Sequence, residues 1–230
     1  PVPAAPARVE ESQAAINSGP SQLFTLLPTE QTGIAFTNPI DDSHALRHLY
    51  AVAQMCGGVA IGDVNGDGRP DVYLTGGPRD NRLYLQAEPL QFRDATQAAD
   101  VASRDAWSTG AAMADVDNDG DLDIYVCSYD APNRLYINRG DGTFVDEAKE
   151  RGVDFVDASQ MVAFCDYDRD GDLDFYLLTY KYVHPQGEPK DVAVVEANRV
   201  VVGPRRQKNY RIAEVHEKEV GRDDVKDDGL

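Results

Sequence analysis

Short runs of alternating apolar and polar residues recur along the middle of the chain, separated by clusters of Gly, Pro, Asn and Asp. In the first unit, residues 58–62 read Gly-Val-Ala-Ile-Gly, residues 71–75 read Asp-Val-Tyr-Leu-Thr, residues 82–86 read Arg-Leu-Tyr-Leu-Gln, and a further run surrounds Phe92. Runs of this length and composition predict β-strands. Four short strands in about 50 residues are typical of one blade of a β-propeller.

This unit is repeated along the chain. Acidic loops begin at Asp63, Asp115 and Asp166, which gives a period of 52 and then 51 residues. Each loop is preceded by Ala and a large apolar residue and followed by Tyr, and Asn-Arg-Leu-Tyr occurs at both 81–84 and 133–136. The period matches propeller blades rather than helical hairpins. We therefore expect an all-β fold, a partial β-propeller with three blades of four-stranded antiparallel sheet.

The ends of the chain do not follow the repeat. The third repeat departs from the pattern at His184, where the first two carry Asn, and a highly charged stretch with little apolar periodicity follows. The first twenty residues are rich in Pro, Ala and Ser. We expect a flexible N-terminal segment at 1–22, blades at 23–180, and an irregular insertion or tail at 181–230 that leads to further blades as one alternative.

The charge of the chain is strongly negative. It has 40 Asp plus Glu against 22 Lys plus Arg, a net charge of −18 and an isoelectric point near 4.4. Such a charge repels phosphate backbones and anionic membranes, so nucleic acid is a poor candidate partner. The acids are concentrated in the three loops, where bound divalent cations would relieve their repulsion.

The loops span residues 63–71, 115–123 and 166–174, and all three have the spacing of a cation site. Each carries Asp or Asn at positions 1, 3 and 5, Gly at position 6 and Asp at position 9. Oxygens at alternate positions of a tightly curled loop converge on one point, Gly allows the sharp turn, and position 7 offers its carbonyl. Ca²⁺ prefers six to eight such oxygens, whereas Mg²⁺ prefers fewer protein ligands and strict octahedral geometry. We expect about three Ca²⁺ sites.

The EF-hand is an alternative that the sequence itself excludes. An EF-hand loop begins in the same way but needs an acidic ligand at position 12 and helices on both sides. Position 12 is Leu74, Val126 and Leu177 in the three loops, each inside an apolar strand-like run.

Three Cys and one Trp complete the candidate chemistry. Cys56, Cys127 and Cys165 lie in or beside apolar runs and lack the spacing of a disulfide scaffold or a zinc site. We expect buried thiols, with one disulfide and one free thiol as the alternative. Trp107 is expected in the core or wedged between blades. No apolar run reaches the roughly 18 residues that a membrane-spanning helix needs.

Together these residues resemble the FG-GAP or VCBS repeats of integrin-alpha-like propellers, and among them the bacterial proteins similar to cartilage acidic protein. The resemblance rests on the Asp-rich loops, on Gly-Val-Ala-Ile-Gly-Asp at 58–63, on Asn-Arg-Leu-Tyr, and on Gly-Asp-Gly-Thr-Phe at 140–144. It implies a seven-bladed propeller with Ca²⁺ held between neighbouring strands of a blade, in a secreted, periplasmic or cell-surface protein. Three blades cannot close a ring, so further blades or self-association would complete it.

The resemblance also assigns metal ligands by position in each loop, with position 7 acting through its carbonyl. These residues are Asp63, Asn65, Asp67, Arg69, Asp71, Asp115, Asp117, Asp119, Asp121, Asp123, Asp166, Asp168, Asp170, Asp172 and Asp174.

The sequence favours a calcium-stabilised module that binds a protein or glycan ligand in adhesion, with structural calcium and no catalytic residue. One alternative is a non-catalytic part of, or a scaffold for, a polysaccharide lyase or hydrolase. The histidines, His44, His48, His184 and His216, lie in no recognisable nucleophile or zinc motif. A third hypothesis is a lectin-like module that stacks sugars on Tyr and Trp107.

Overall fold

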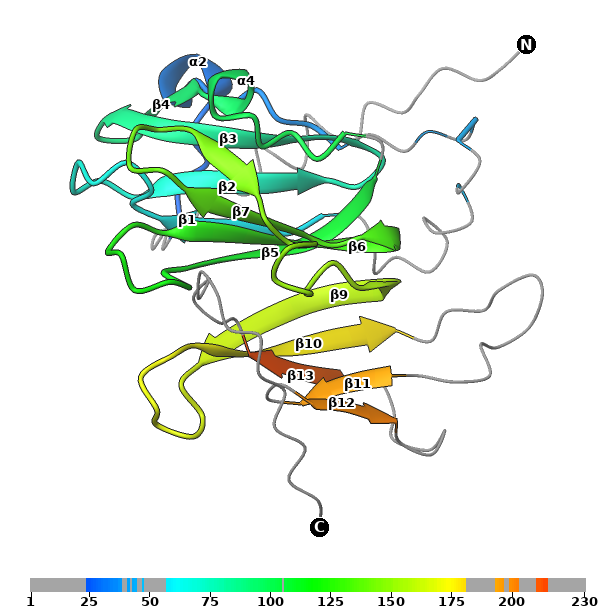
Figure 1. Ribbon diagram of the computed structural model, residues 1–230. Coiled ribbons are helices and arrows are strands. Elements are labelled where there is room, and N and C mark those ends of the chain that lie inside the picture. The colour runs from blue at the N-terminus through cyan, green and yellow to red at the C-terminus, as the bar shows by residue number, and fades with distance from the viewer. Residues whose placement is uncertain are drawn as a thin grey trace.

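The computed structural model describes residues 24–38, 41, 43–44, 47, 57–104, 106–180, 193–196, 199–202 and 210–214. The helices are α2 (Thr29–Thr32) and α4 (Thr96–Ala99). The strands are β1 (Val59–Gly62), β2 (Asp71–Gly76), β3 (Arg79–Glu88), β4 (Gln91–Asp94), β5 (Trp107–Ala114), β6 (Asp123–Pro132), β7 (Arg134–Asn138), β8 (Phe144–Asp146), β9 (Val156–Cys165), β10 (Asp174–Tyr180), β11 (Ala193–Glu196), β12 (Arg199–Val202) and β13 (Tyr210–Glu214). Figure 1 shows β9, β10 and β13 on the opposite side of β5 and β6 from β2 and β3.

The first two repeats form four-stranded antiparallel units, as the sequence predicted. Strands β1 to β4 pair in chain order in the first unit, and β5 to β8 do so in the second. The two units share the same register, because Ala60 pairs with Tyr73 in the first and Ala112 pairs with Tyr125 in the second. The fold is therefore consistent with blades of a partial β-propeller.

The third unit is built differently from the first two. Strand β10 is flanked by β9 on one side and by β13 on the other, so its third described strand comes from residues 210–214. The interval 181–230, where an irregular insertion or tail was expected, also contains the hairpin of β11 and β12. The expected segment 1–22 lies outside the described residues, and the proposed domain boundaries remain predictions.

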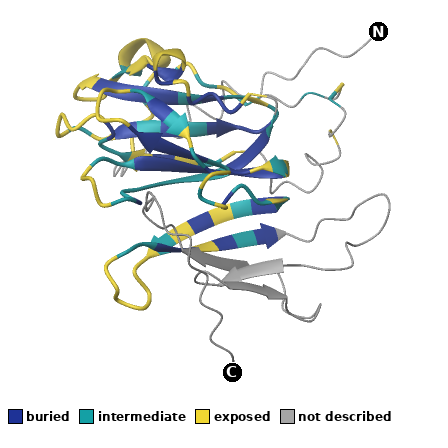
Figure 2. Cartoon of the chain, viewed as in Figure 1, coloured by how far each residue is buried: buried dark blue, intermediate teal, exposed yellow. Residues whose placement is uncertain are grey.

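The core lies between successive sheets. In β6, Ile124 and Val126 belong to one buried apolar cluster, which includes residues of the first unit. Tyr125 and Cys127 belong to a second cluster, which includes Phe175 of the third unit. Successive side chains of a strand point to opposite faces, so β6 is buried on both sides. Figure 2 shows the buried residues running along the strands. Each unit therefore buries its apolar faces against a neighbouring unit and not by itself.

Exposure at equivalent repeat positions differs between the units. Ile61 in β1 is 64% exposed, whereas its equivalent Met113 in β5 packs against the first core cluster. At the other side, Tyr176 in β10 is 36% exposed, although its equivalents Tyr73 and Tyr125 are fully buried. Ile61 and Tyr176 are thus more exposed than the equivalent residues that lie between two units of this chain.

The first strands of the second and third units approach each other closely at Gly110. A Cβ atom at this position would lie 2.2 Å from the carbonyl oxygen of Gln160 in β9. We expect Gly110→Ala to lower the free energy of unfolding by about 2–3 kcal/mol, because the backbone of β9 would have to move. Urea denaturation of the variant measures this effect. An unchanged midpoint would contradict the close approach.

Several sequence predictions are settled by burial. Cys127 is a buried free thiol, as predicted. The prediction for Cys165 is wrong, since this free thiol is exposed at the end of β9, beside the acidic loop. Cys56 lies outside the described residues. Trp107 is 3% exposed, which confirms its place in the core. Among the described residues, no helix has the length and apolar character needed to cross a membrane.

Candidate metal centres

The acidic loops connect the first two strands of their units. Residues 63–71 join β1 to β2, residues 115–123 join β5 to β6, and residues 166–174 join β9 to β10. Figure 1 shows them as cyan, green and yellow turns at the same end of the sheets. The Nδ2 of Asn118 donates a hydrogen bond to the carbonyl oxygen of Gly171 at 3.3 Å, so the second and third loops are in contact.

The first carboxylate of each loop closes the turn. In the second loop, Asp115 Oδ1 accepts the N–H of Asp119 at 3.1 Å and Oδ2 accepts the N–H of Gly120 at 3.0 Å. Gly120 has a φ of 96°, which a residue with a side chain rarely adopts. Asp63 accepts the N–H groups of positions 5 and 6 in the same way. The shape of the turn is therefore the first reason why each loop has Asp at position 1 and Gly at position 6.

The last carboxylate of each loop begins the second strand of its unit and is buried. Asp71, Asp123 and Asp174 are 0%, 1% and 5% exposed. Asp123 accepts the N–H of Val116 at 2.9 Å and that of Asn138 at 2.8 Å. This carboxylate therefore joins its loop to the end of β7.

Three carboxylates converge in each of the second and third loops. Oxygen atoms of Asp115, Asp117 and Asp123 lie within 4.8 Å of one another, and the same holds for Asp166, Asp168 and Asp174. These are positions 1, 3 and 9 of the loops, whereas the sequence led us to expect positions 1, 3 and 5 to converge, with position 9 closing the site. The other predicted acids, Asp119, Asp121, Asp170 and Asp172, lie outside both clusters.

The first loop has a different internal arrangement. Asp67 Oδ2 accepts hydrogen bonds from the guanidinium of Arg69 at 2.7 Å and from the Nδ2 of Asn65 at 3.1 Å. Arg69 Nε also donates to the carbonyl oxygen of Gln86 at 2.9 Å. Asp63, Asp67 and Asp71 do not form a cluster of the kind described for the other two loops.

One oxygen in the second loop is buried without a partner. Asp117 Oδ1 makes no hydrogen bond, whereas Asp117 Oδ2 accepts one from Arg151 Nη2 at 3.1 Å. Only 7% of the Arg151 side chain is exposed, and its Nε donates to Glu147 Oε2 at 3.1 Å. A buried, unpaired carboxylate oxygen is costly, and a cation beside it would remove that cost. The residues of this cluster therefore fit a hard, oxygen-preferring cation such as Ca²⁺.

Burial and mutual repulsion make the clustered carboxyls hard to ionise. Burial raises the pKa of Asp123 to about 7, with smaller contributions from the charges of Asp117 and Asp119, although two backbone N–H groups oppose the rise. Burial also raises the pKa of Asp117, helped by the charge of Asp119 and opposed by Arg151. Without a cation, the second loop thus holds negative charge at a cost to folding.

The metal-free protein should become less stable as pH rises. The pKa of Asp123 is higher in the folded chain than the usual value, so its contribution is present at low pH and is lost as pH rises through about 7. We expect the free energy of unfolding in chelator to be lower at about pH 7.5 than at about pH 5. Urea denaturation at the two pH values tests this, and Asp123→Asn should reduce the difference. A stability that rises with pH and is insensitive to this substitution would contradict it.

The sequence did not reveal the role of the buried Asn in each Asn-Arg-Leu-Tyr motif. Asn133 accepts the N–H of Ser128 at 2.8 Å and donates to Tyr125 Oη and Ser159 Oγ, each at 3.0 Å. Ser159 belongs to β9, so this side chain connects the second unit to the third. The repetition of the motif was the sequence feature that could have indicated this role. No such feature indicated the role of Arg151, because the first repeat has Ala99 at the equivalent position.

The repeated antiparallel units and their acidic loops define a repeat protein with a partial β-propeller fold. The family model for the FG-GAP-like repeat matches residues 63–126 and again residues 115–177, which together make up half of the chain. The chain therefore belongs to the FG-GAP-like repeat family.

Individual relatives agree with this assignment. The chain is 34% identical over 132 residues to cartilage acidic protein 1 of Homo sapiens, a match that covers 50% of this chain and 19% of that protein. It is 33% identical over 132 residues to the Mus musculus protein of the same name, with 50% and 20% covered. The Xenopus tropicalis protein is 42% identical over 66 residues, with 28% and 10% covered. The matched region thus spans a fifth or less of each relative.

Proposed function

We propose that this chain is part of a calcium-binding, extracytoplasmic β-propeller module that binds a protein or glycan ligand, with structural calcium and no catalysis. The observation that carries the calcium proposal is the convergence of three carboxylates in each of two loops, one with a buried oxygen that lacks a hydrogen-bond partner. Membership in the FG-GAP-like repeat family supports a binding role.

The proposed ligands are those that the sequence assigns by position. Asp115, Asp117 and Asp123 would hold one ion and Asp166, Asp168 and Asp174 a second, with positions 5 and 7 completing each shell. The first loop would hold a third ion more weakly, since Asn65 replaces a carboxylate there and Asp67 must exchange its contact with Arg69. Bound calcium would supply positive charge to the clusters, while the chain's own backbone N–H groups hold the carboxylates in place.

Calcium titration tests this proposal directly. Isothermal calorimetry and native mass spectrometry of the metal-stripped chain should reveal two tighter ions and one weaker ion, with Mg²⁺ a poor competitor. Asp117→Asn should remove one of the two tighter ions and leave the other. Binding of no calcium at millimolar concentration would refute the proposal.

The proposed compartment is secreted, periplasmic or at the cell surface. Calcium outside the cytoplasm reaches the millimolar range in which extracellular modules of modest affinity are loaded. Fractionation of cells that express the natural protein, with detection in the medium, periplasm and cytoplasm, decides this point. Recovery from the cytoplasm alone would overturn it.

We also propose that further blades, or another copy of the chain, cover the exposed face of β1 at Ile61, which is 64% exposed. The equivalent residue of the second unit, Met113, is partly buried against the first core cluster. Sedimentation of the chain with and without Ile61→Glu measures association through this face. If the chain and the variant are both monomers, further blades and not another copy of the chain would provide the cover.

A further inference from the structure

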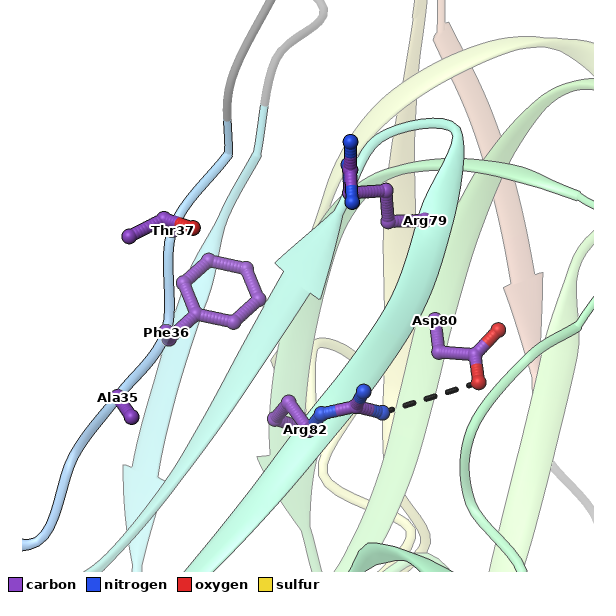
Figure 3. A pocket seen from close by; sticks show the side chains of 6 residues that line it. All are labelled: Ala35, Phe36, Thr37, Arg79, Asp80 and Arg82. Carbon is purple, nitrogen blue, oxygen red and sulfur yellow. Dashed lines mark ion pairs between the residues drawn. The ribbon is translucent and has the colours of Figure 1, made fainter.

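Arginines gather around two hollows in a chain whose net charge is −18. The first hollow, about 370 Å³, lies between residues 35–37 and the start of β3, where Arg79 and Arg82 line it (Figure 3). The second, about 530 Å³, has Arg104, Arg134 and Arg139 in its lining. Neither hollow includes a residue of the three acidic loops.

The second hollow lies beside β7, which contributes Arg134 and Tyr136 to its lining. Arg134 begins this strand and Arg139 follows its last residue, so the two arginines are separated by roughly 17 Å at the rise of an extended strand. Tyr136 lies between them in the sequence, and Arg104 contributes from the segment before β5. The lining thus combines three segments of the chain, residues 100–104, 134–139 and 144–146, and places three arginines beside Asp100 and Asp146.

The two hollows are connected through Asp80. Its carboxylate Oδ2 lies 3.8 Å from Arg82 in the first hollow and 3.8 Å from Arg104 in the second. Figure 3 shows the ion pair between Asp80 and Arg82, both of which belong to β3. We call the set Arg79, Arg82, Arg104, Arg134 and Arg139 the arginine band, which crosses from the first unit to the second.

Most guanidinium groups of the arginine band have capacity for another anion. Arg139 and Arg79 form no salt bridge with another described residue, and the contacts of Asp80 at 3.8 Å are too long for hydrogen bonds. Arg104 has 61% of its side chain exposed. Arg134 is closely paired, at 2.9 Å from Asp146, and Arg82 lies 3.6 Å from Asp94 and donates to the carbonyl oxygen of Asn81 at 3.2 Å. Exposed ion pairs contribute little, so a ligand can replace them at small cost.

From this arrangement we propose that the arginine band binds the carboxylates of an extended, uronic-acid-containing polysaccharide. The inference rests on the proposed binding function and names its ligand class. Guanidinium groups recognise carboxylates through two parallel hydrogen bonds. The aromatic side chains of the second hollow, Tyr136 and Phe144, are buried, so they do not offer the exposed apolar anchors that a protein partner needs. A net charge of −18 disfavours densely charged nucleic acid, whereas widely spaced carboxylates suit isolated arginines.

The test uses the calcium-loaded chain and a hyaluronan decasaccharide, in which uronic acid alternates with a neutral sugar. Calorimetry should show saturable binding that weakens as salt is raised. A neutral chitin oligosaccharide of equal length should bind at least about tenfold more weakly, because it offers no carboxylate to the arginines. Equal binding of the two sugars would overturn the proposal.

A double variant, Arg104→Gln with Arg139→Gln, should reduce hyaluronan affinity by about tenfold or more. Arg93→Gln is the matched control, because Arg93 is exposed on β4 outside both hollows. An equal loss in both variants would indicate non-specific attraction and refute the assigned site. Absence of hyaluronan binding by a chain that still binds calcium would refute the arginine band and leave the calcium proposal standing.

Discussion

Removing calcium is expected to lower the melting temperature of this protein by about 10–20 °C. Each loop that binds calcium only in the folded state stabilises that state by about 2.7 kcal/mol when free calcium is 100 times the dissociation constant. The two carboxylate clusters together would contribute about 5 kcal/mol. In a domain of this size, each kcal/mol shifts the melting temperature by roughly 2–4 °C. Scanning calorimetry in calcium and in chelator measures the shift.

Single substitutions test whether the shift belongs to the clusters. Asp117→Asn removes a carboxylate from the second loop, so about half of the calcium-dependent shift should disappear. Asp154→Asn is the control, because Asp154 lies outside all three loops and its substitution should leave the shift intact. A melting temperature that is the same in calcium and in chelator would count decisively against structural calcium.

The repeat made the first two units predictable from sequence, but not the third. Fixed offsets place strands on both sides of each acidic loop, and pairs such as Ala60 with Tyr73 follow from them. Strand β13 lies far beyond the expected position and lacks the Asn-Arg-Leu-Tyr motif. Strands pair through backbone hydrogen bonds, which do not require a particular sequence motif. The entropic cost of closing a longer connection grows only slowly with its length. A segment far along the chain can therefore take the place of the missing third strand.

The candidate metal centres were predictable in position but not in detail. Ligand spacing predicted that positions 1, 3 and 5 converge and that position 9 closes the site, whereas positions 1, 3 and 9 lie together in the second and third loops. It did not indicate that Arg69 pairs with Asp67 in the first loop, nor that Arg151 contacts Asp117 in the second. These contacts depend on how flexible arginines are placed by the folded chain, which the spacing of acids does not encode.

Replacing Asn133 with Ala is expected to destabilise the protein by about 3–5 kcal/mol. Asn133 is 1% exposed, and its loss would deprive the N–H of Ser128 of its acceptor and Tyr125 and Ser159 of a donor. Each buried polar group left without a partner costs about 1–3 kcal/mol. Part of that cost is offset at Tyr125, whose hydroxyl still donates to the carbonyl oxygen of Val153. Urea denaturation in saturating calcium measures the effect separately from metal binding.

Ser128→Ala provides the matched control at the same place in the core. The hydroxyl of Ser128 is buried and has no hydrogen-bond partner, so its removal should leave stability unchanged or raise it by up to about 1 kcal/mol. The backbone N–H of Ser128 would still donate to Asn133. If both substitutions were equally harmful, the loss would reflect disturbed packing around β6. A large loss for Asn133→Ala alone would establish that the hydrogen bonds of this side chain, including the one to Ser159 of β9, stabilise the protein.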